Sequence, residues 1–197
     1  MLNDLLCSRA REFVNVSTCY LKGFWGQRLT VDEYERVLKM YPVNAKYGNE
    51  TLCSSDVFPF DCVCFVKALL GGATVNRRLT YKEMSANPLG DCTCEKFYNS
   101  LYDCVSPESA PAGYGLATLS HSALSLGSGV WIDCNFSGGQ NGVAIHTGGI
   151  PSYFKAGKIP SIEYPSKPDE SEILHAFADY LIELYLGNTK IGFLSLI

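Results

Sequence analysis

The spacing of apolar residues along the chain changes near residue 116. Before this point apolar residues recur every three or four positions, which is typical of helices that bury one face. The rest of residues 73–112 has no steady period, so irregular structure is expected there. The spacing predicts the following helices: 1–16, from Thr30 or Asp32 to residue 40, 62–71, and a short one near 94–103.

From residue 116 onward, apolar and polar residues alternate in short runs that glycine-rich turns separate, and this pattern predicts strands. Helices followed by an antiparallel meander indicate an α+β fold, with N-terminal helices packed on a central antiparallel sheet. Prolines at 165–169 mark a boundary, so we expect one domain over 1–165 and a helical appendage over 166–197. The predicted strands are 116–119, 121–126, 130–135, 142–147 and 159–164.

The composition narrows the classes of protein. A chain of 197 residues with 47% hydrophobic and 18% charged residues is suited to one compact core. A net charge of −4 without a basic face argues against a nucleic-acid partner. Polar residues interrupt each apolar run before the roughly 18 residues that a bilayer span needs. The first residues show no secretory signal, so we expect synthesis in a cytoplasm.

Cys62 is the residue that points most directly to chemistry. It follows Asp61, which suits the N-cap of the third predicted helix, so the thiol lies in the first turn of that helix. Exposed backbone amides at a helix start favour a thiolate over a thiol. The same amides can receive the oxyanion that forms when a thiolate attacks a carbonyl. The residue is therefore a candidate nucleophile.

His121 and Asp133 follow Cys62 in the chain order expected of a base and the carboxylate that orients it. They lie on two strands of one predicted hairpin. With a three-residue loop at 127–129, Leu126 pairs with Val130 and Ala123 faces Asp133, which makes His121 a diagonal neighbour of Asp133 on one face. A two-residue loop would reverse this parity. On the next strand, His146 is the reserve candidate for the base.

Nine cysteines in the chain also raise a zinc-site hypothesis. In the pair Cys62 and Cys64, positions two apart on a helix point in nearly opposite directions and cannot share an ion. A metal site made by Cys92, Cys94 and Cys104 stays open. The odd count and the absence of a signal peptide favour reduced thiols, of which at most one does chemistry. We therefore expect no metal and no cofactor.

The chain carries an aromatic glycine turn, a cysteine motif, a histidine motif and an acidic motif at 20–26, 60–67, 120–127 and 130–134. These motifs resemble those of NlpC-type papain-like peptidases of bacterial cell walls, particularly the phage-encoded members. Residues 157–164 are similar to the segment that closes the sheet in such enzymes. Ser120 and Lys22 depart from the family pattern, in which a glycine and a tryptophan are usual, and residues 73–115 match poorly.

The resemblance implies a papain-like fold, with Cys62 as nucleophile, His121 as base, Asp133 as the orienting residue and Tyr20 as a hydroxyl on the substrate side. It implies hydrolysis of amide bonds in the stem peptides of peptidoglycan. We assign Asp61 and Trp131 to the substrate cleft as well, since Trp131 shares the His121 face in the predicted register. Metal ligands are not among the assigned residues.

The expected function is thus that of a phage lysin or a virion-associated wall-degrading enzyme, whose partner is bacterial peptidoglycan and which acts at the cell wall after release. The appendage at 166–197 is expected to dock on the domain, on a second copy or on a partner subunit. Three alternatives stay open: an acyltransferase on the same fold, a non-catalytic wall-binding module and a zinc-binding structural protein.

Overall fold

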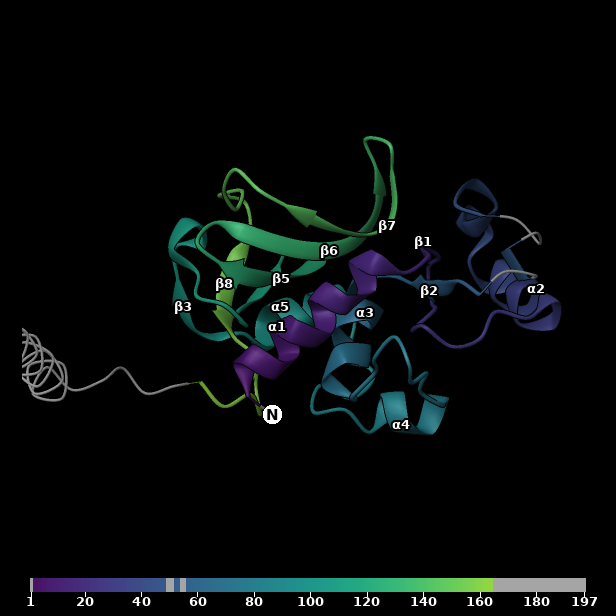
Figure 1. Ribbon diagram of the computed structural model, residues 1–197, viewed down its shortest axis with the longest axis horizontal. Helices are drawn as coiled ribbons and strands as arrows, with labels where there is room; N and C mark the ends of the chain where they lie inside the picture. Colours follow the sequence, from purple (N-terminus) through teal and green to yellow (C-terminus); the bar gives the residue numbers. More distant parts are fainter. Residues whose placement is uncertain (1, 49–51, 54–55, 165–197) are drawn as a thin grey trace, which may run out of the picture. The chain divides into compact units, whose positions relative to one another are not determined.

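The computed structural model describes residues 2–48, 52–53 and 56–164. Met1–Glu163 forms one compact unit, and Tyr164–Ile197 forms a second. The appendage predicted for 166–197, with its last helix and its docking role, lies outside the described residues. The described part mixes helices and strands, and its largest sheet is antiparallel, as the α+β prediction required (Figure 1).

A six-stranded antiparallel sheet forms the centre of the first unit (Figure 1). Its middle is the predicted meander, and the chain then returns so that the last strand pairs with both β3 and β4. The strand order is β3-β8-β4-β5-β6-β7. The strands are β3 Tyr102–Val105, β4 Gly115–Ala117, β5 Ser122–Gly127, β6 Val130–Ser137, β7 Gln140–His146 and β8 Lys155–Lys158.

Two strand predictions were wrong. The last strand is β8 at Lys155–Lys158, ahead of the predicted 159–164, and β3 lies in a region predicted to be irregular apart from one helix. Small residues explain why β8 was missed, because Ala156 and Gly157 give no apolar alternation. At Gly157 a Cβ atom would lie 2.9 Å from the backbone oxygen of Tyr102, so the close strand pairing favours glycine. After Ile159, Ser161 turns the chain with a φ of 66°.

Five α-helices lie in the described ranges (Figure 1), and cap residues determine where several of them begin. Thr30 caps the second helix and Asp61 caps the third, both through side-chain oxygens that accept a backbone N–H. The first helix is shorter than predicted because residues 13–15 tighten into a 3₁₀ turn. The helices are α1 Asn3–Glu12, α2 Val31–Met40, α3 Cys62–Leu70, α4 Tyr81–Ser85 and α5 Cys94–Ser100.

A small two-stranded parallel sheet directly precedes α3. Strand β1 Thr18–Tyr20 pairs with β2 Phe58–Phe60, and Tyr20 lies opposite Phe60 in this register. Since α3 begins two residues after β2 ends, the pairing places Tyr20 near the start of that helix. The sequence did not predict these strands, because three residues are too few to show a period of two.

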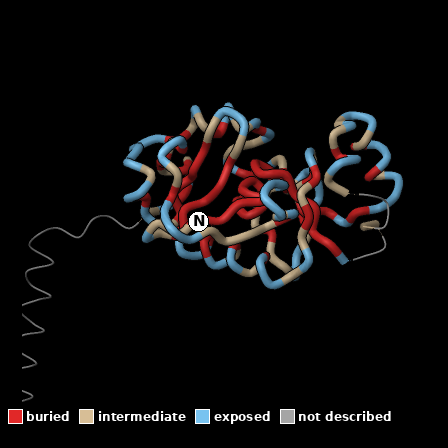
Figure 2. The backbone as a smooth tube through the Cα atoms, turned by 90° about the horizontal axis from the view of Figure 1, so that it is seen from above, coloured by how far each residue is buried: buried red, intermediate tan, exposed pale blue. Residues whose placement is uncertain are grey.

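Helix α3 is buried along its whole length and packs against α1, α5, β5 and β6. Phe13 lies under it, with its ring centroid 5.3 Å from that of Phe58, 5.2 Å from Phe60 and 5.9 Å from Phe65, all edge to face. Figure 2 shows the buried stretches of chain in the interior of the unit and the exposed residues in the outer loops. This aromatic cluster fixes the position of the helix that carries Cys62.

Phe13→Ala is expected to lower the free energy of unfolding by about 3–5 kcal/mol, because it leaves a cavity among three other rings and removes their edge contacts. Phe13 is 0% exposed, whereas Phe136 is 41% exposed and serves as a control of the same residue type. Phe136→Ala should cost less than about 1 kcal/mol. Denaturant unfolding measures both values, and equal losses would contradict the central role of Phe13.

Candidate active site

Asp61 fixes the start of α3 and the loop that faces it. One carboxylate oxygen accepts the Cys64 N–H at 2.6 Å, and the other accepts the Gly23 N–H at 2.8 Å. Burial raises the pKa of Asp61, against the opposing effect of these two hydrogen bonds. Gly23 has a φ of 84°, and a Cβ there would meet the Tyr41 ring at 2.6 Å. Asp61, which was assigned to the substrate cleft, does line the cleft. Its role there is that of a helix cap, since both of its oxygens already accept backbone N–H groups.

Tyr20 lies at the same end of α3. Its ring contacts Tyr47 edge to face with centroids 5.0 Å apart, and its backbone N–H donates to the side-chain oxygen of Asn141 at 2.8 Å. Burial, together with the nearby Cys62 and Asp61, raises the pKa of the phenol, so it stays protonated. Tyr20 lines the same cleft as Cys62. The structure thus brings the predicted phenol to the predicted nucleophile.

His121 and Asp133 are in contact, as the predicted hairpin implied. His121 Nε2 lies 2.7 Å from Asp133 Oδ2, and the aspartate side chain is 0% exposed. Burial favours the protonated acid, but hydrogen bonds from His121, His146 and Gln140 outweigh it and lower the pKa of Asp133. An ionised carboxylate only accepts hydrogen bonds, so the Nε2 atom of His121 carries the hydrogen. The Nδ1 atom is left with a lone pair that can take a proton.

The loop of the hairpin between β5 and β6 differs from the predicted one, although His121 and Asp133 still meet. Ala123 faces Asp133 as predicted, but Gly127, rather than Leu126, pairs with Val130. The loop therefore has two residues, Ser128 and Gly129, with φ values of 54° and 74°, as a type I′ turn requires. A bulge between Ser125 and Gly127 adds one residue and restores the parity that a two-residue loop would otherwise reverse.

A second histidine binds the same carboxylate. His146 Nε2 lies 2.8 Å from Asp133 Oδ1, and the Gln140 side-chain amide donates to this oxygen at 3.1 Å. Asp133 pairs with Ala144 across β6 and β7, so His146 is its diagonal neighbour on that side, just as His121 is on the other. The rule that located His121 would have located His146 too, had it been applied to the next hairpin.

Trp131 supports this second histidine. Its indole ring stacks on the His146 ring with centroids 3.9 Å apart and an interplanar angle of 18°, and its N–H donates to the Gly149 carbonyl at 3.2 Å. Trp131 was assigned to the wall of the cleft, but it is not among the residues that line the cleft beside Cys62. In this structure it holds His146 against Asp133.

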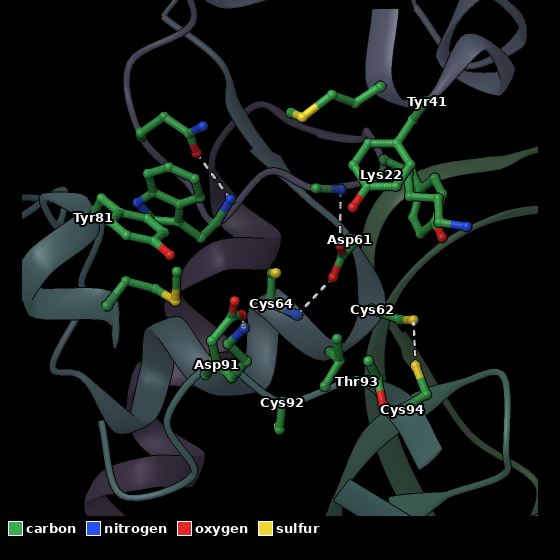
Figure 3. Close-up of a pocket in the computed structure, with 18 of the residues that line it drawn as sticks. Lys22, Tyr41, Asp61, Cys62, Cys64, Tyr81, Asp91, Cys92, Thr93 and Cys94 are labelled. Carbon is green, nitrogen blue, oxygen red and sulfur yellow. Dashed lines mark hydrogen bonds and ion pairs between the residues drawn. The ribbon is translucent and has the colours of Figure 1, made fainter. Parts of the chain in front are cut away.

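The structure places a second thiol against Cys62. Cys62 Sγ and Cys94 Sγ are 3.5 Å apart and share a hydrogen bond (Figure 3). This bond lowers the pKa of Cys94 to about 7, because its effect is larger than the opposing effect of burial. The same bond, followed by burial, raises the pKa of Cys62 well above its usual value, so the thiolate expected on Cys62 at the helix start is not favoured. No motif pairs these residues, which are 32 positions apart and belong to α3 and α5, so the sequence prediction missed Cys94.

The start of β5 lies between His121 and the two thiols in the chain of contacts. Ser122, the residue after His121, directs its backbone N–H to Cys62 and so opposes the rise in the pKa of that thiol. The charge of His121 contributes to lowering the pKa of Cys94. Helix α3 packs against β5 and β6, and α5 packs against β5. The tertiary structure therefore places the start of β5, next to His121, against the helices that carry the two thiols.

A cleft of about 1080 Å³ opens at Cys62 and Cys94 (Figure 3). Leu119 and Ser120, which precede His121, border it, and so does Lys22. Its lining includes aromatic rings and charged groups of both signs, so it offers both stacking surfaces and ionic partners to a ligand. The rings are Tyr20, Trp25, Tyr41 and Tyr81, and the charged side chains are Lys22, Arg28, Glu33, Arg36, Asp61, Lys67 and Asp91.

The remaining cysteines of the two close pairs, Cys64 and Cys92, have a different charged neighbour. Cys64 and Cys92 lie near the Lys67 amine, which bonds Asp91 Oδ1 at 2.7 Å, and Lys67 opposes the rise in pKa that burial gives both thiols. In the described residues, no group of three or more His, Cys, Asp or Glu side chains is arranged to hold a metal ion.

Thiolate titration is expected to show one thiol that ionises near pH 7, about two units below the ordinary value of 9.0. Above that pH one thiolate forms, and below it both sulfurs are protonated. Cys62→Ala removes the hydrogen-bond donor, so the pKa of Cys94 should return toward its ordinary value. The ultraviolet absorbance of thiolates and the rate of alkylation against pH measure this, with the exposed Cys104 changed to Ser as the control. An unchanged titration in Cys62→Ala would contradict the shared bond.

Comparisons add no relatives to this picture. The chain matches no protein-family model, no curated protein and no solved structure. In residues 2–48, 52–53 and 56–164, the structure contains no helix that is long and apolar enough to span a bilayer. The motifs and the geometry of the site therefore carry the functional argument.

Proposed function

We propose that this chain is a cysteine hydrolase of papain-like fold that cleaves amide bonds in the stem peptides of bacterial peptidoglycan. The observation that carries the proposal is the contact of His121 Nε2 with Asp133 Oδ2 at 2.7 Å, on a fully buried carboxylate, with the backbone N–H of the next residue, Ser122, directed to Cys62. A thiol, an imidazole and a carboxylate in this relation are the parts of nucleophilic acyl transfer.

The first chemical step is proton transfer and attack. His121 takes the Cys62 proton at Nδ1, because its Nε2 atom is held by Asp133. The sulfur then adds to the scissile carbonyl. Since the Cys64 N–H is engaged by Asp61, the N–H groups of Cys62 and Val63 are the donors that the start of α3 offers to the oxyanion. Asp133 stabilises the imidazolium that forms.

The second step releases the products. The imidazolium of His121 gives its proton to the leaving amine, which departs and leaves a thioester on Cys62. Water, deprotonated by the same imidazole, attacks the thioester carbonyl and frees the acid. Tyr20, which is protonated and lines the cleft, supplies a hydroxyl that can hydrogen-bond the substrate.

The cleft supports an extended peptide substrate. At about 1080 Å³, with an aromatic and charged lining, it is suited to a chain that carries carboxylates and amines. Stem peptides of peptidoglycan have this chemistry, and the motifs at 20–26, 60–67, 120–127 and 130–134 resemble those of peptidases that cut them. On the same resemblance we propose a phage lysin or a virion-associated enzyme that acts at the cell wall.

The test is incubation with purified peptidoglycan and mass analysis of the soluble fragments. Wild type and Cys104→Ser should release fragments with new amino termini, whereas Cys62→Ser should release none. The identity of the new terminus shows which bond is cut. Fragments released equally by wild type and Cys62→Ser would contradict the proposal. Transfer of stem peptides to an added amine without new termini would indicate the acyltransferase alternative instead.

A further inference from the structure

We propose that Cys62 and Cys94 are a reversible modification site: under peroxide they form a disulfide that blocks the nucleophile, and a thiol reductant restores it. This inference rests on the proposed function for its effect on activity, because a blocked Cys62 matters only where Cys62 attacks a substrate. The formation of the bond itself depends only on the two sulfurs and their surroundings.

The geometry of the two sulfurs is the first argument. Their separation of 3.5 Å must fall to about 2.05 Å in a disulfide, a movement of roughly 1.5 Å shared between two side chains. Helices α3 and α5 pack against each other, so both sulfurs are brought together by elements of one fold unit. The side chains already point toward each other in Figure 3. Closing the bond needs adjustment of the side chains rather than unfolding.

Access to solvent is the second argument. Both cysteines line the open cleft, and Cys94 is only partly buried. A small oxidant such as hydrogen peroxide therefore reaches the pair by the path that substrate would use. A thiolate, rather than a thiol, reacts with peroxide, and the lowered pKa of Cys94 supplies one near neutral pH.

The neighbouring cysteines provide the contrast. Cys64 follows Cys62 by two residues and Cys92 precedes Cys94 by two, but both lie near the Lys67 amine instead. Burial raises the pKa of both. The pair formed by Cys62 and Cys94 therefore differs from its neighbours in its partner and in its ionisation, and Cys92 is a matched control.

The chemistry balances with hydrogen peroxide as the oxidant. The Cys94 thiolate attacks one peroxide oxygen, the O–O bond breaks, hydroxide leaves and a sulfenic acid forms on Cys94. The Cys62 sulfur then attacks the Cys94 sulfur, the S–O bond breaks and a second hydroxide leaves. Protons from the two thiols convert both hydroxides to water. In total, two thiols and one hydrogen peroxide give one disulfide and two waters, and a dithiol reductant reverses the result.

The experiment treats the full chain with one equivalent of hydrogen peroxide and maps it without reduction. Cleavage after lysine and arginine releases residues 47–67 and 83–96, which carry Cys62 and Cys94. Wild type should give these two peptides linked and two hydrogens lighter, and so should Cys92→Ser. Cys94→Ser should give no such linked pair. Wall hydrolysis by the wild type should fall in proportion to the linked fraction and return with dithiol treatment.

The outcomes separate this inference from the proposed function. Absence of the linked pair in wild type, or an equal yield of it in Cys94→Ser, would overturn the inference. A linked pair with undiminished hydrolysis would overturn its effect on activity. If the chain hydrolyses no wall at all, the proposed function fails, and the mass map still decides whether the disulfide forms. Because the wild-type map needs no variant, a poorly folding mutant does not prevent a decision.

Discussion

Cys62→Ser is expected to lower kcat for amide cleavage by about 10⁴-fold or more, since the alcohol is a far weaker nucleophile at neutral pH than a thiol that has a base beside it. The serine keeps nearly the same volume in a buried position, so the fold and the cleft should persist. Initial rates on purified wall or on a soluble stem-peptide fragment measure the loss. Unfolding by denaturant and binding to wall should change little.

The control for this prediction is another cysteine. Cys104 is exposed, lies in β3 and is not among the residues that line the cleft, so Cys104→Ser should keep the wild-type rate. A loss in Cys62→Ser of less than about tenfold, equivalent to 1.4 kcal/mol in the barrier, would rule out covalent catalysis by this sulfur. Trapping of a thioester in the wild type, localised by mass to residues 47–67, would support it directly.

Asp133→Asn is expected to lower kcat by about 10³–10⁴-fold, because the amide offers one acceptor and one donor where the carboxylate offers two acceptors. Two Nε2–H groups, of His121 and His146, compete for that single acceptor. Whichever histidine meets the amide donor must change its tautomer. If this is His121, the Nδ1 atom carries a hydrogen and cannot take the proton of Cys62. The imidazolium also loses its counter-charge.

The two histidines provide the control for Asp133→Asn. His146→Gln keeps an N–H that can reach Asp133, so the loss of rate should stay within about tenfold, comparable to one altered hydrogen bond. His121→Gln removes the base and should lower kcat nearly as much as Asp133→Asn does. Steady-state kinetics on a soluble stem peptide compare all three variants. Equal losses from His121→Gln and His146→Gln would contradict the assignment of His121 as the base.

Much of the site could be predicted because it depends on local rules. The N-cap at Asp61 places Cys62 in the first turn of α3, which is a matter of neighbouring residues. The pairing of Ala123 with Asp133 follows from alternation along one hairpin, although the loop and the bulge that produce it were not predicted. The side-chain period of two is robust, whereas the number of residues in a turn depends on backbone angles that a sequence shows poorly.

Other parts required contacts between distant segments. Trp131 was placed on the correct face, but only the pairing of β6 with β7 shows that it stacks on His146. The parallel pairing of β1 with β2 brings Tyr20 to the start of α3 from a point 42 residues earlier in the chain. Neither fact has a local sequence signal, because strands of three residues and partners on other strands leave no periodic pattern.

The amino-acid sequence alone determined the helix start that carries the thiol, the faces of the hairpin that carry His121 and Asp133, and the order of the helices before the strands of the large sheet. These depend on capping preferences and on side-chain period, which act within a few residues. Only the tertiary structure decided that Cys94 lies 3.5 Å from Cys62 and that two histidines share one buried carboxylate. The packing of α3 against α5 and β5 creates the thiol contact, because burial of apolar faces, and no rule of spacing, chooses which distant side chains meet.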